Sequence, residues 1–227
     1  MATLRELKGR IGSVASSEKI TGAMKMISSA KMHKAEGALK RLVPFRYQIE
    51  TIMGNLLSAD ADFTSPLVES HLEVIAVTSK SEGRSVRDFM AALNDAYVSG
   101  ATDRVEVIYV HYHSAGRQRL TDITFLPVNS ADLGGDAAAK GASRPYLFEP
   151  DPQTIFSTVL PLYLLSTMQE IFAQNRASEQ AARVMAMQSA NDNAKKLLEQ
   201  LQLEYNKLRQ QSITSELLDI VGGQVRD

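Results

Sequence analysis

The sequence predicts an α/β protein dominated by helix, in which a long N-terminal and a long C-terminal helix pair as an antiparallel coiled coil. Between Pro161 and Gly222 there is no proline or glycine, and most residues there are strong helix formers. The N-terminal segment opens with apolar residues at helical spacing. Short apolar strand-like runs and one amphipathic helix lie between the two ends, which predicts a small α/β domain in the middle of the chain.

Composition limits the classes of protein to which the chain can belong. Its 227 residues suffice for one or two domains. A formal net charge of -1 argues against wholesale nucleic-acid binding, and the lack of cysteine excludes disulfides and thiolate metal sites. No uninterrupted apolar run approaches the ~20 residues that span a bilayer, and the N-terminus lacks a signal-peptide core. We therefore expect a soluble protein, or one held at a membrane through other proteins.

The N-terminal helix is expected to begin at once and to run to about Ser58, with a bend or fray near Pro44. Thr3 and Glu6 have the spacing of a capping box. One apolar stripe follows at alternating spacings of three and four residues: Leu4, Leu7, Ile11 and Val14. The next strong apolar set departs from that spacing: Ile20, Met24 and Ile27. The stripe is therefore expected to slip, so that a long regular supercoil is not specified.

Positive charge predominates in the first 46 residues, with ten Lys or Arg against three acidic residues. This excess fits a solvated basic face, or an electropositive surface that matches acidic protein surfaces. Nucleic acid is less favoured, because the basic residues are spread around the helix with few aromatics between them.

The middle of the chain predicts one strand–helix–strand unit followed by a further strand. Strands are expected at 72–78, at 105–112 with apolar residues on both faces, and at 119–128. An amphipathic helix is expected over 85–98, ended by Gly100. We divide the chain into an N-terminal helix (1–59), an α/β domain (70–130), a loop (131–150) and a C-terminal helix (151–223).

The C-terminal helix is predicted to begin at Asp151-Pro152 and to end at Gly222-Gly223. From Leu162 to Val221 it would extend roughly 90 Å. Its apolar stripe comprises Leu164, Met168, Ile171, Ala182, Met185, Ala194, Leu197, Leu201 and Leu208. Polar residues interrupt the stripe: Asn175, Ser178 and Asp192. Two imperfect stripes at opposite ends of one chain predict that the helices pair with each other.

The sequence carries no recognisable catalytic, cofactor or metal motif. A phosphate-binding loop is absent, and no glycine-rich dinucleotide motif follows the first strand. His111 and His113 would share one face of a strand, but no third metal ligand is in evidence nearby. We therefore predict no catalytic residue, no cofactor and no metal site.

Two segments resemble a known family. Residues 19–31 (Lys-Ile-Thr-Gly-Ala-Met-Lys-Met-Ile-Ser-Ser-Ala-Lys) resemble the N-terminal helix of the gamma subunit of F-type ATP synthases. Residues 187–223, including Asn191-Asp192-Asn193-Ala194 and the run from Arg209 to Glu216, resemble the C-terminal helix of that family. Residues 103–109 and 124–127 are similar to the later part of its α/β domain.

The resemblance implies a non-catalytic subunit, the central shaft that rotates inside a hexamer of alpha and beta subunits. It implies that a proton- or sodium-translocating membrane ring drives the shaft and so couples ion flow to ATP synthesis or hydrolysis. The implied partners are the alpha, beta and epsilon subunits and the c-ring, without nucleic acid and without direct insertion into the membrane. The implied location is peripheral, on the cytoplasmic side of a bacterial inner membrane or at an organellar inner membrane.

The family pattern also implies subunit-contact residues, which map onto Met24, Arg183, Arg209, Gln210, Thr214 and Glu216. Without the resemblance, each would be interpreted as an ordinary exposed helix residue.

One departure from the family pattern concerns the α/β domain. Family members carry an Asp-Arg-Gly-Leu-Cys-Gly-type segment and further elements after the first strand, whereas here Val77-Thr78-Ser79 runs directly into Lys80-Ser81-Glu82. The Rossmann-like domain is therefore incomplete, either because it is reduced or because part of it is omitted. The alternative function is a static coiled-coil adaptor or scaffold, and an enzyme ranks last.

Overall fold

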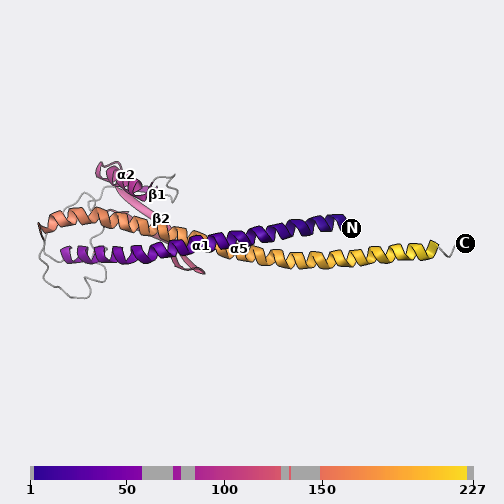
Figure 1. Cartoon of the computed structure of the whole chain (residues 1–227). Coiled ribbons are helices and arrows are strands. Elements are labelled where there is room, and N and C mark those ends of the chain that lie inside the picture. Colours follow the sequence, from indigo (N-terminus) through magenta and orange to yellow (C-terminus); the bar gives the residue numbers. More distant parts are fainter. Residues whose placement is uncertain (1–2, 58–73, 78–84, 129–132, 134–148, 224–227) are drawn as a thin grey trace. The chain divides into compact units, whose positions relative to one another are not determined.

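A computed structural model describes residues 3–57, 74–77, 85–128, 133 and 149–223. In chain order the elements are α1 (Leu4–Leu57), β1 (Val74–Val77), α2 (Val86–Val98), β2 (Arg104–Ser114), β3 (Arg117–Leu126) and α5 (Pro152–Gly223), as Figure 1 shows. The predicted fold class, two long terminal helices with a small α/β part, is confirmed. The predicted loop over 131–150 lies mostly outside the described residues.

Local capping explains where both long helices begin. At α1, the Thr3 amide donates to Glu6 Oε2 at 2.8 Å and the Glu6 amide donates to Thr3 Oγ1 at 3.3 Å, so the capping box is confirmed. At α5, the Thr154 amide donates to Asp151 Oδ2 at 2.9 Å. This bond, with the one from the Thr154 hydroxyl, lowers the pKa of Asp151. Helix α1 continues through Pro44 without interruption.

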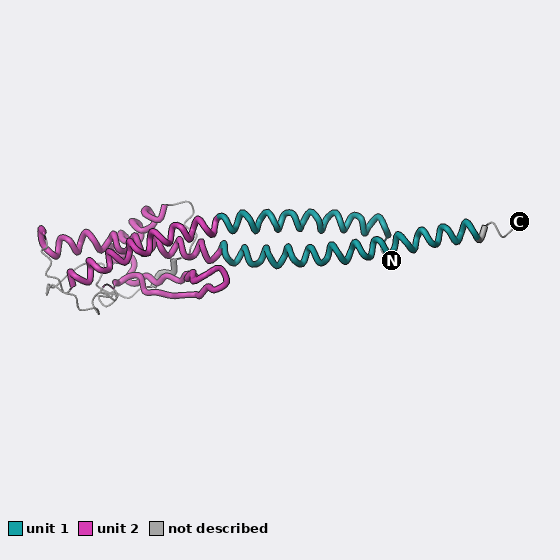
Figure 2. The backbone as a smooth tube through the Cα atoms, turned by 60° about the horizontal axis from the view of Figure 1, so that its bottom comes forward, with its two compact units in different colours: residues 1–30, 180–227 teal, residues 31–179 magenta. Residues whose placement is uncertain are grey.

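The chain divides into two compact units, which Figure 2 colours separately. Unit 1 comprises Met1–Ala30 and Gln180–Asp227, that is, the first part of α1 and the last part of α5. The two helical segments of unit 1 lie side by side and antiparallel, and α5 continues past the N-terminal end of α1 (Figure 2). Unit 2 comprises Lys31–Glu179 and holds the sheet, α2 and the remaining parts of the long helices.

The inward face of α1 keeps heptad spacing, so the predicted slip after Val14 is wrong. Starting at Leu4, the positions of α1 that recur at alternating spacings of three and four residues are all buried or half-buried. We call this set of positions the seam of α1. In unit 1 the seam consists of Leu4, Leu7, Ile11, Val14, Glu18, Thr21, Lys25 and Ser28. The apolar residues that suggested a slip point outward: Ile20, Met24 and Ile27. The helix thus keeps one face toward its partner, and polar residues occupy the middle of that face.

The inward face of α5 in unit 1 follows the same rule. The positions at heptad spacing are all buried or half-buried: Gln180, Val184, Met187, Asn191, Ala194, Leu198, Leu201, Tyr205, Leu208 and Ser212. Three positions beside them are also buried or half-buried: Ala181, Gln188 and Ala190. Three residues of the predicted stripe are exposed instead: Ala182, Met185 and Leu197. The prediction chose the apolar residues of the segment. In the structure, the inward positions are instead set by the helical period, whatever residue occupies them.

The sheet has the order β1-β2-β3, with β1 parallel to β2 and β2 antiparallel to β3. One face is buried through Val105, Val107 and Leu126. The other face carries Ile108 and Leu120, which are 61% and 70% exposed. The expectation that β2 would be covered on both faces is therefore wrong for the face that holds these two residues.

The core of unit 2 joins α2 and the sheet to the long helices. Phe89 of α2 meets Phe172 of α5 edge to face, with ring centroids 6.1 Å apart. The Ser178 hydroxyl donates to the Val110 carbonyl at 3.0 Å and so ties α5 to β2. The buried apolar residues of this core include Ile49, Met53, Leu56, Met90, Leu93, Val105, Leu126, Phe156, Leu160, Leu164 and Met168.

By length and composition alone, one window of α5 within Pro152–Val221 is apolar enough to cross a membrane. The apolar residues near the start of α5, among them Phe156, Leu160 and Met168, are buried in the core of unit 2. Of the apolar window, 39% is buried inside the structure, so core packing accounts for part of its apolar composition.

Two leucines of β3 provide a test of which sheet face is packed. Replacing the fully buried Leu126 with Ala leaves a cavity, so we expect the free energy of unfolding to fall by about 3 kcal/mol. Replacing the 70% exposed Leu120 with Ala should change it by less than about 0.5 kcal/mol. Urea denaturation of both variants measures the difference, and equal losses would contradict the assignment of the faces.

Candidate functional site

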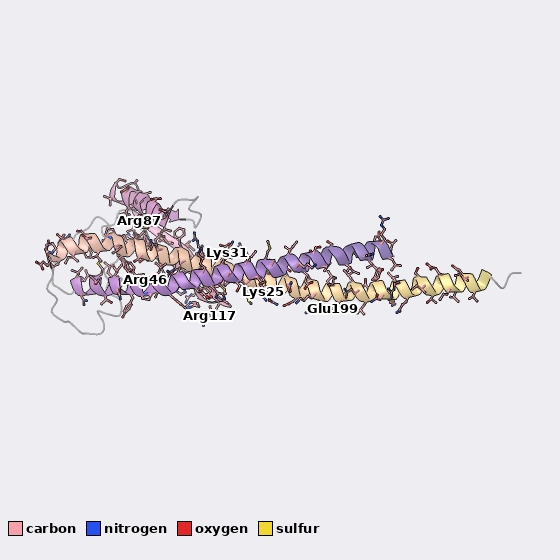
Figure 3. All side chains as sticks on the ribbon, viewed as in Figure 1. Lys25, Lys31, Arg46, Arg87, Arg117 and Glu199 are labelled. Atoms are coloured by element: carbon pink, nitrogen blue, oxygen red, sulfur yellow. The ribbon has the colours of Figure 1, made fainter. Side chains whose placement is uncertain are left out.

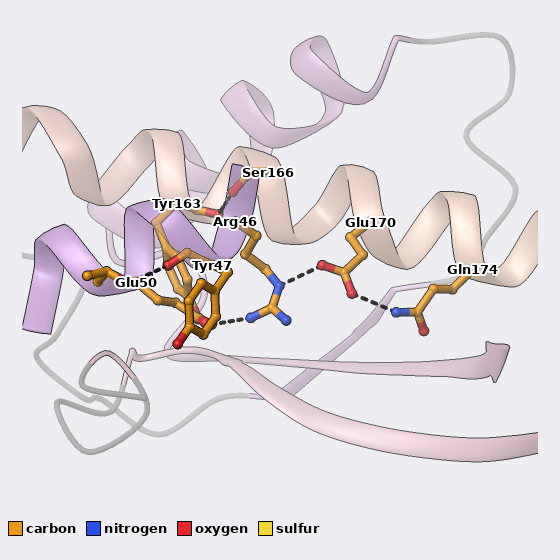
Figure 4. A network of polar contacts seen from close by, with 8 residues as sticks. Arg46, Tyr47, Glu50, Tyr163, Ser166, Glu170 and Gln174 are labelled. Carbon is orange, nitrogen blue, oxygen red and sulfur yellow. Dashed lines mark hydrogen bonds and ion pairs between the residues drawn. The ribbon is translucent and has the colours of Figure 1, made fainter. Parts of the chain in front are cut away.

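A network of polar side chains joins α1 to α5 inside unit 2 (Figure 4). Arg46 of α1 donates from Nε to Glu170 Oε2 of α5 at 2.6 Å and from its guanidinium to Glu50, one turn along α1. Gln174 Nε2 donates to the other Glu170 oxygen at 2.7 Å, and the Tyr163 hydroxyl lies 3.4 Å from Glu50 Oε1. Two carboxylates and one guanidinium thus share a site where Glu170 is buried.

The electrostatics of this network fix the charge of its cation. Burial disfavours the charged guanidinium, but the hydrogen bond and the attraction of Glu170, with the further attraction of Glu50, outweigh burial and raise the pKa of Arg46. Arg46 therefore stays charged at every accessible pH. Its role is to neutralise carboxylates that would otherwise repel each other inside the protein.

A pocket of about 270 Å³ lies beside the network. Its lining includes Tyr109 and His111 from β2 together with Arg46, Thr167 and Gln174. Burial raises the pKa of Tyr109 and lowers that of His111, so both side chains are uncharged near neutral pH. Three buried polar atoms of the residues that line this pocket have no hydrogen-bond partner in the described structure: His111 Nδ1, Thr167 Oγ1 and Gln174 Oε1.

The pocket does not assemble a recognisable reaction centre. His111 and His113 do share a face, as predicted, with ring centroids 4.4 Å apart. Among the residues that the structure describes, however, no three His, Asp or Glu side chains are grouped as metal ligands. The hydrogen bonds of the network link α1 to α5 through Arg46 and Glu170 and through Glu50 and Tyr163.

An exposed apolar stripe on α1 is the first candidate contact surface of unit 1. Ile20, Met24 and Ile27 are 58%, 50% and 56% exposed, and their spacing places them on one face. They lie in the same stretch of helix whose seam positions are polar. Large apolar residues turned outward while polar residues turn inward are typical of a surface that another protein covers.

The last turns of α5 form the second candidate surface. Beyond Leu208 no described residue of α5 is buried, and α5 there extends past the N-terminal end of α1 (Figure 2). The exposed large apolar residues of these turns are Ile213, Leu217, Leu218, Ile220 and Val221. This segment has no α1 residues to pack on within unit 1, so its apolar side chains are available to a partner.

The structure groups four of the six predicted contact residues on these last turns of α5: Arg209, Gln210, Thr214 and Glu216, all exposed. The Thr214 hydroxyl donates to the Gln210 carbonyl at 2.9 Å, and the Ser212 hydroxyl to Glu216 at 3.4 Å. Met24 lies on the exposed stripe of α1, and Arg183 is exposed on an earlier turn of α5.

Charge is unevenly distributed between the two helices of unit 1. Lys25 of α1 and Glu199 of α5 mark the two in Figure 3. From Gln180 to Val221, α5 carries five basic and five acidic residues. Between Thr3 and Ala30, α1 carries two acidic residues and five basic ones: Arg5, Lys8, Arg10, Lys19 and Lys25. The first four are exposed, as an electropositive contact surface requires.

The sequence analysis missed the polar seam and the Arg46 network. Continuing the three-four count from Val14 would have placed Glu18, Thr21 and Lys25, and later Arg46, on the inward face of α1, but it does not identify the partner of Arg46. The partner Glu170 is 124 positions away from Arg46, and nothing local to either residue identifies the pair.

Comparison with known sequences gives a consistent family. The chain matches the ATP synthase family profile over residues 3–83 and 80–225. It is 32% identical to the ATP synthase gamma chain of Bacteroides thetaiotaomicron, with all of both chains covered. It is 34% identical to that of Phocaeicola vulgatus, covering 98% of this chain and 99% of the relative.

Solved structures share the fold. A chain of the Euglena gracilis mitochondrial ATP synthase, in an assembly of OSCP, F1 and c-ring, aligns with a TM-score of 0.60 and 18% identity over 98% of this chain and 93% of its own. A chain from the rotor of the same enzyme aligns with a TM-score of 0.53 and 17% identity, covering 92% and 98% of the two chains. Two long helices beside a small sheet thus form a fold found in ATP synthases. The chain belongs to the family of ATP synthase gamma chains.

The comparisons also locate the departure noted in the sequence. The alignment with the Bacteroides thetaiotaomicron chain extends over 303 positions, whereas this chain has 227 residues, so 303 − 227 = 76 aligned positions have no residue here. The two profile matches meet at residues 80–83, immediately after the Ser79 at which the family's segment was expected.

The buried Arg46–Glu170 ion pair can be compared with the exposed Arg104–Glu106 pair, which has the same nitrogen–oxygen distance. We expect Glu170→Gln to lower the free energy of unfolding by about 2 kcal/mol, because Arg46 would lose its charged partner in a site where Glu170 is 9% exposed. Arg104 and Glu106 also approach to 2.6 Å but are 48% and 41% exposed, so Glu106→Gln should cost less than about 1 kcal/mol. Urea denaturation measures both values. Equal effects would show that burial does not strengthen the Arg46 pair.

Proposed function

We propose that this protein is the central rotating shaft of an F-type ATP synthase. In this role it couples ion translocation through the membrane ring to ATP synthesis or hydrolysis in a hexamer of alpha and beta subunits. The observation that carries the proposal is the match to gamma chains along the whole chain. The paired helices of unit 1, with exposed apolar side chains on both, agree with it.

The physical requirement on such a shaft is contact without tight fixation. Apolar contact is non-directional, so a helix face bearing Ile20, Met24 and Ile27 can be covered at several rotational angles. Directional hydrogen bonds and charges then define preferred angles, provided that they are few. We assign this second role to Arg183, Arg209, Gln210, Thr214 and Glu216, with Met24 as an apolar contact.

The chain itself takes no chemical step in this proposal. The catalytic sites belong to the alpha and beta subunits, and the shaft changes their affinities through its asymmetry, since it presents different side chains to each site as it turns. The epsilon subunit and the c-ring are the remaining proposed partners. The protein would then be peripheral to the membrane, on the cytoplasmic side of a bacterial inner membrane, since the relatives named above are bacterial.

Reconstitution tests the proposal against a static adaptor. The chain is mixed with alpha and beta subunits of the same source, and ATP-driven rotation of a bead fixed to unit 2 is recorded. Rotation is the expected result. A stable complex that hydrolyses ATP without rotation would favour the static scaffold, and failure to form any complex would overturn both the shaft and its assigned contacts.

The terminal turns of α5 provide a sharper test of individual contacts. We expect the double substitution Arg209→Ala and Gln210→Ala to lower ATP turnover of the reconstituted complex about five- to tenfold, equivalent to about 1–1.4 kcal/mol. Helix content should not change, because both side chains are exposed. Glu199→Ala with Gln200→Ala, also exposed on α5, is the matched control and should leave turnover unchanged. Unchanged turnover in the first variant would remove Arg209 and Gln210 from the contact surface.

A further inference from the structure

The seam of α1 in unit 1 changes character partway along. Its first four positions are apolar, and the next four are Glu18, Thr21, Lys25 and Ser28. Apolar packing supplies an attraction that varies little when one helix slides by a whole heptad. A seam that is half polar therefore needs a directional contact to define which residue of α5 meets which residue of α1.

Asn191 of α5 makes such a contact. Its side-chain Nδ2 donates to the backbone carbonyl of Glu18 at 2.9 Å and to Thr21 Oγ1 at 3.3 Å. The Thr21 hydroxyl in turn lies 3.0 Å from the Ser17 and Glu18 carbonyls and donates its single proton to this pair of acceptors. Its oxygen lone pairs are thus left to accept from Asn191. One amide group engages both a backbone and a side-chain acceptor of α1.

Gly22 of α1 lies next to the Asn191 amide. A Cβ atom added to Gly22 would lie 3.5 Å from Asn191 Nδ2, at ordinary contact distance, so the amide already rests on the surface of α1. Asn191 itself is a seam position of α5, half-buried between the helices. The amide is therefore enclosed by α1 on the side where it donates.

We propose that Asn191 fixes the register of α1 against α5 in unit 1. A shift of one heptad would carry Asn191 about 10 Å along α1 and break both hydrogen bonds. A shift toward Leu4 would place its amide against the apolar Ile11 and Val14, whereas the opposite shift would place it against Lys25 and Ser28. The register also determines how many turns of α5 extend beyond Leu4, and hence how much of the Ile213–Val221 surface is free. The inference concerns the pairing of two helices in this chain and holds whether or not the chain rotates in an ATP synthase.

A register contact differs from a stabilising contact in what its loss does. A polar residue at a seam position specifies alignment at a cost in stability relative to an apolar residue of similar size. Replacing Asn191 with Leu should therefore leave the free energy of unfolding unchanged or higher, yet allow more than one alignment. Asn193, two residues further and exposed, is the matched control: Asn193→Leu adds the same side chain outside the seam.

Because the chain has no cysteine, spin labels can be placed at chosen sites of the full-length protein. Labels at Lys8→Cys and Glu199→Cys, both exposed in unit 1, report the alignment by pulsed electron paramagnetic resonance. We expect one distance population in the parent and in Asn193→Leu. We expect a second population in Asn191→Leu, displaced by a helix shift of about 10 Å.

Two outcomes would overturn the inference. A single unchanged distance in Asn191→Leu would show that packing alone sets the register. Loss of unfolding free energy with an unchanged distance would make Asn191 a stabilising contact only. Asn191→Ala, which removes the amide without adding volume, repeats the measurement if the Leu variant does not fold, and the same two distance patterns decide it.

Discussion

The whole arrangement depends on one geometric constraint: two long helices can remain in contact only through positions that recur every three or four residues. On α1 this period runs without a break from Leu4 to Leu56, and every residue on it is buried or half-buried. The side chains that occupy the period vary from leucine to glutamate and lysine. The period determines which residues meet the partner helix, and the chemistry at each position determines what that contact does.

In unit 2 a charged residue occupies one of these heptad positions. Arg46 of α1 donates a hydrogen bond to Glu170 of α5, and the next heptad positions of α1, Ile49 and Met53, are buried and apolar. We expect burial to make the Arg46–Glu170 pair contribute more to stability than the Arg104–Glu106 pair. Both pairs have a nitrogen–oxygen distance of 2.6 Å, but Arg104 and Glu106 are exposed to water. Each unit thus has a polar contact between the long helices, made by Asn191 in unit 1 and by Arg46 in unit 2. Both are hydrogen bonds, which depend on geometry, whereas apolar packing is non-directional.

What could be predicted from the sequence was local. Thr3 with Glu6 and Asp151 with Thr154 mark helix beginnings through residues three positions apart, and the structure confirms both beginnings. The predicted end at Gly222-Gly223 lies at the edge of the described residues and stays a prediction. Two predictions failed because they equated apolar with inward: Met24 and Met185 point outward, and Ile108 lies on an open sheet face. Pairs such as Arg46 and Glu170, or Asn191 and Glu18, are separated by more than a hundred residues, so a single sequence does not reveal them. The six proposed contact residues came from family resemblance and remain predictions.

The outward apolar stripe of Ile20, Met24 and Ile27 has a consequence for the life of the chain before it meets any partner. A newly made copy exposes these side chains, together with the apolar end of α5, in a fully folded state. Exposed apolar surface of this kind favours association with other molecules, including further copies of the same chain. Complete folding therefore does not by itself keep this protein from associating through these two surfaces.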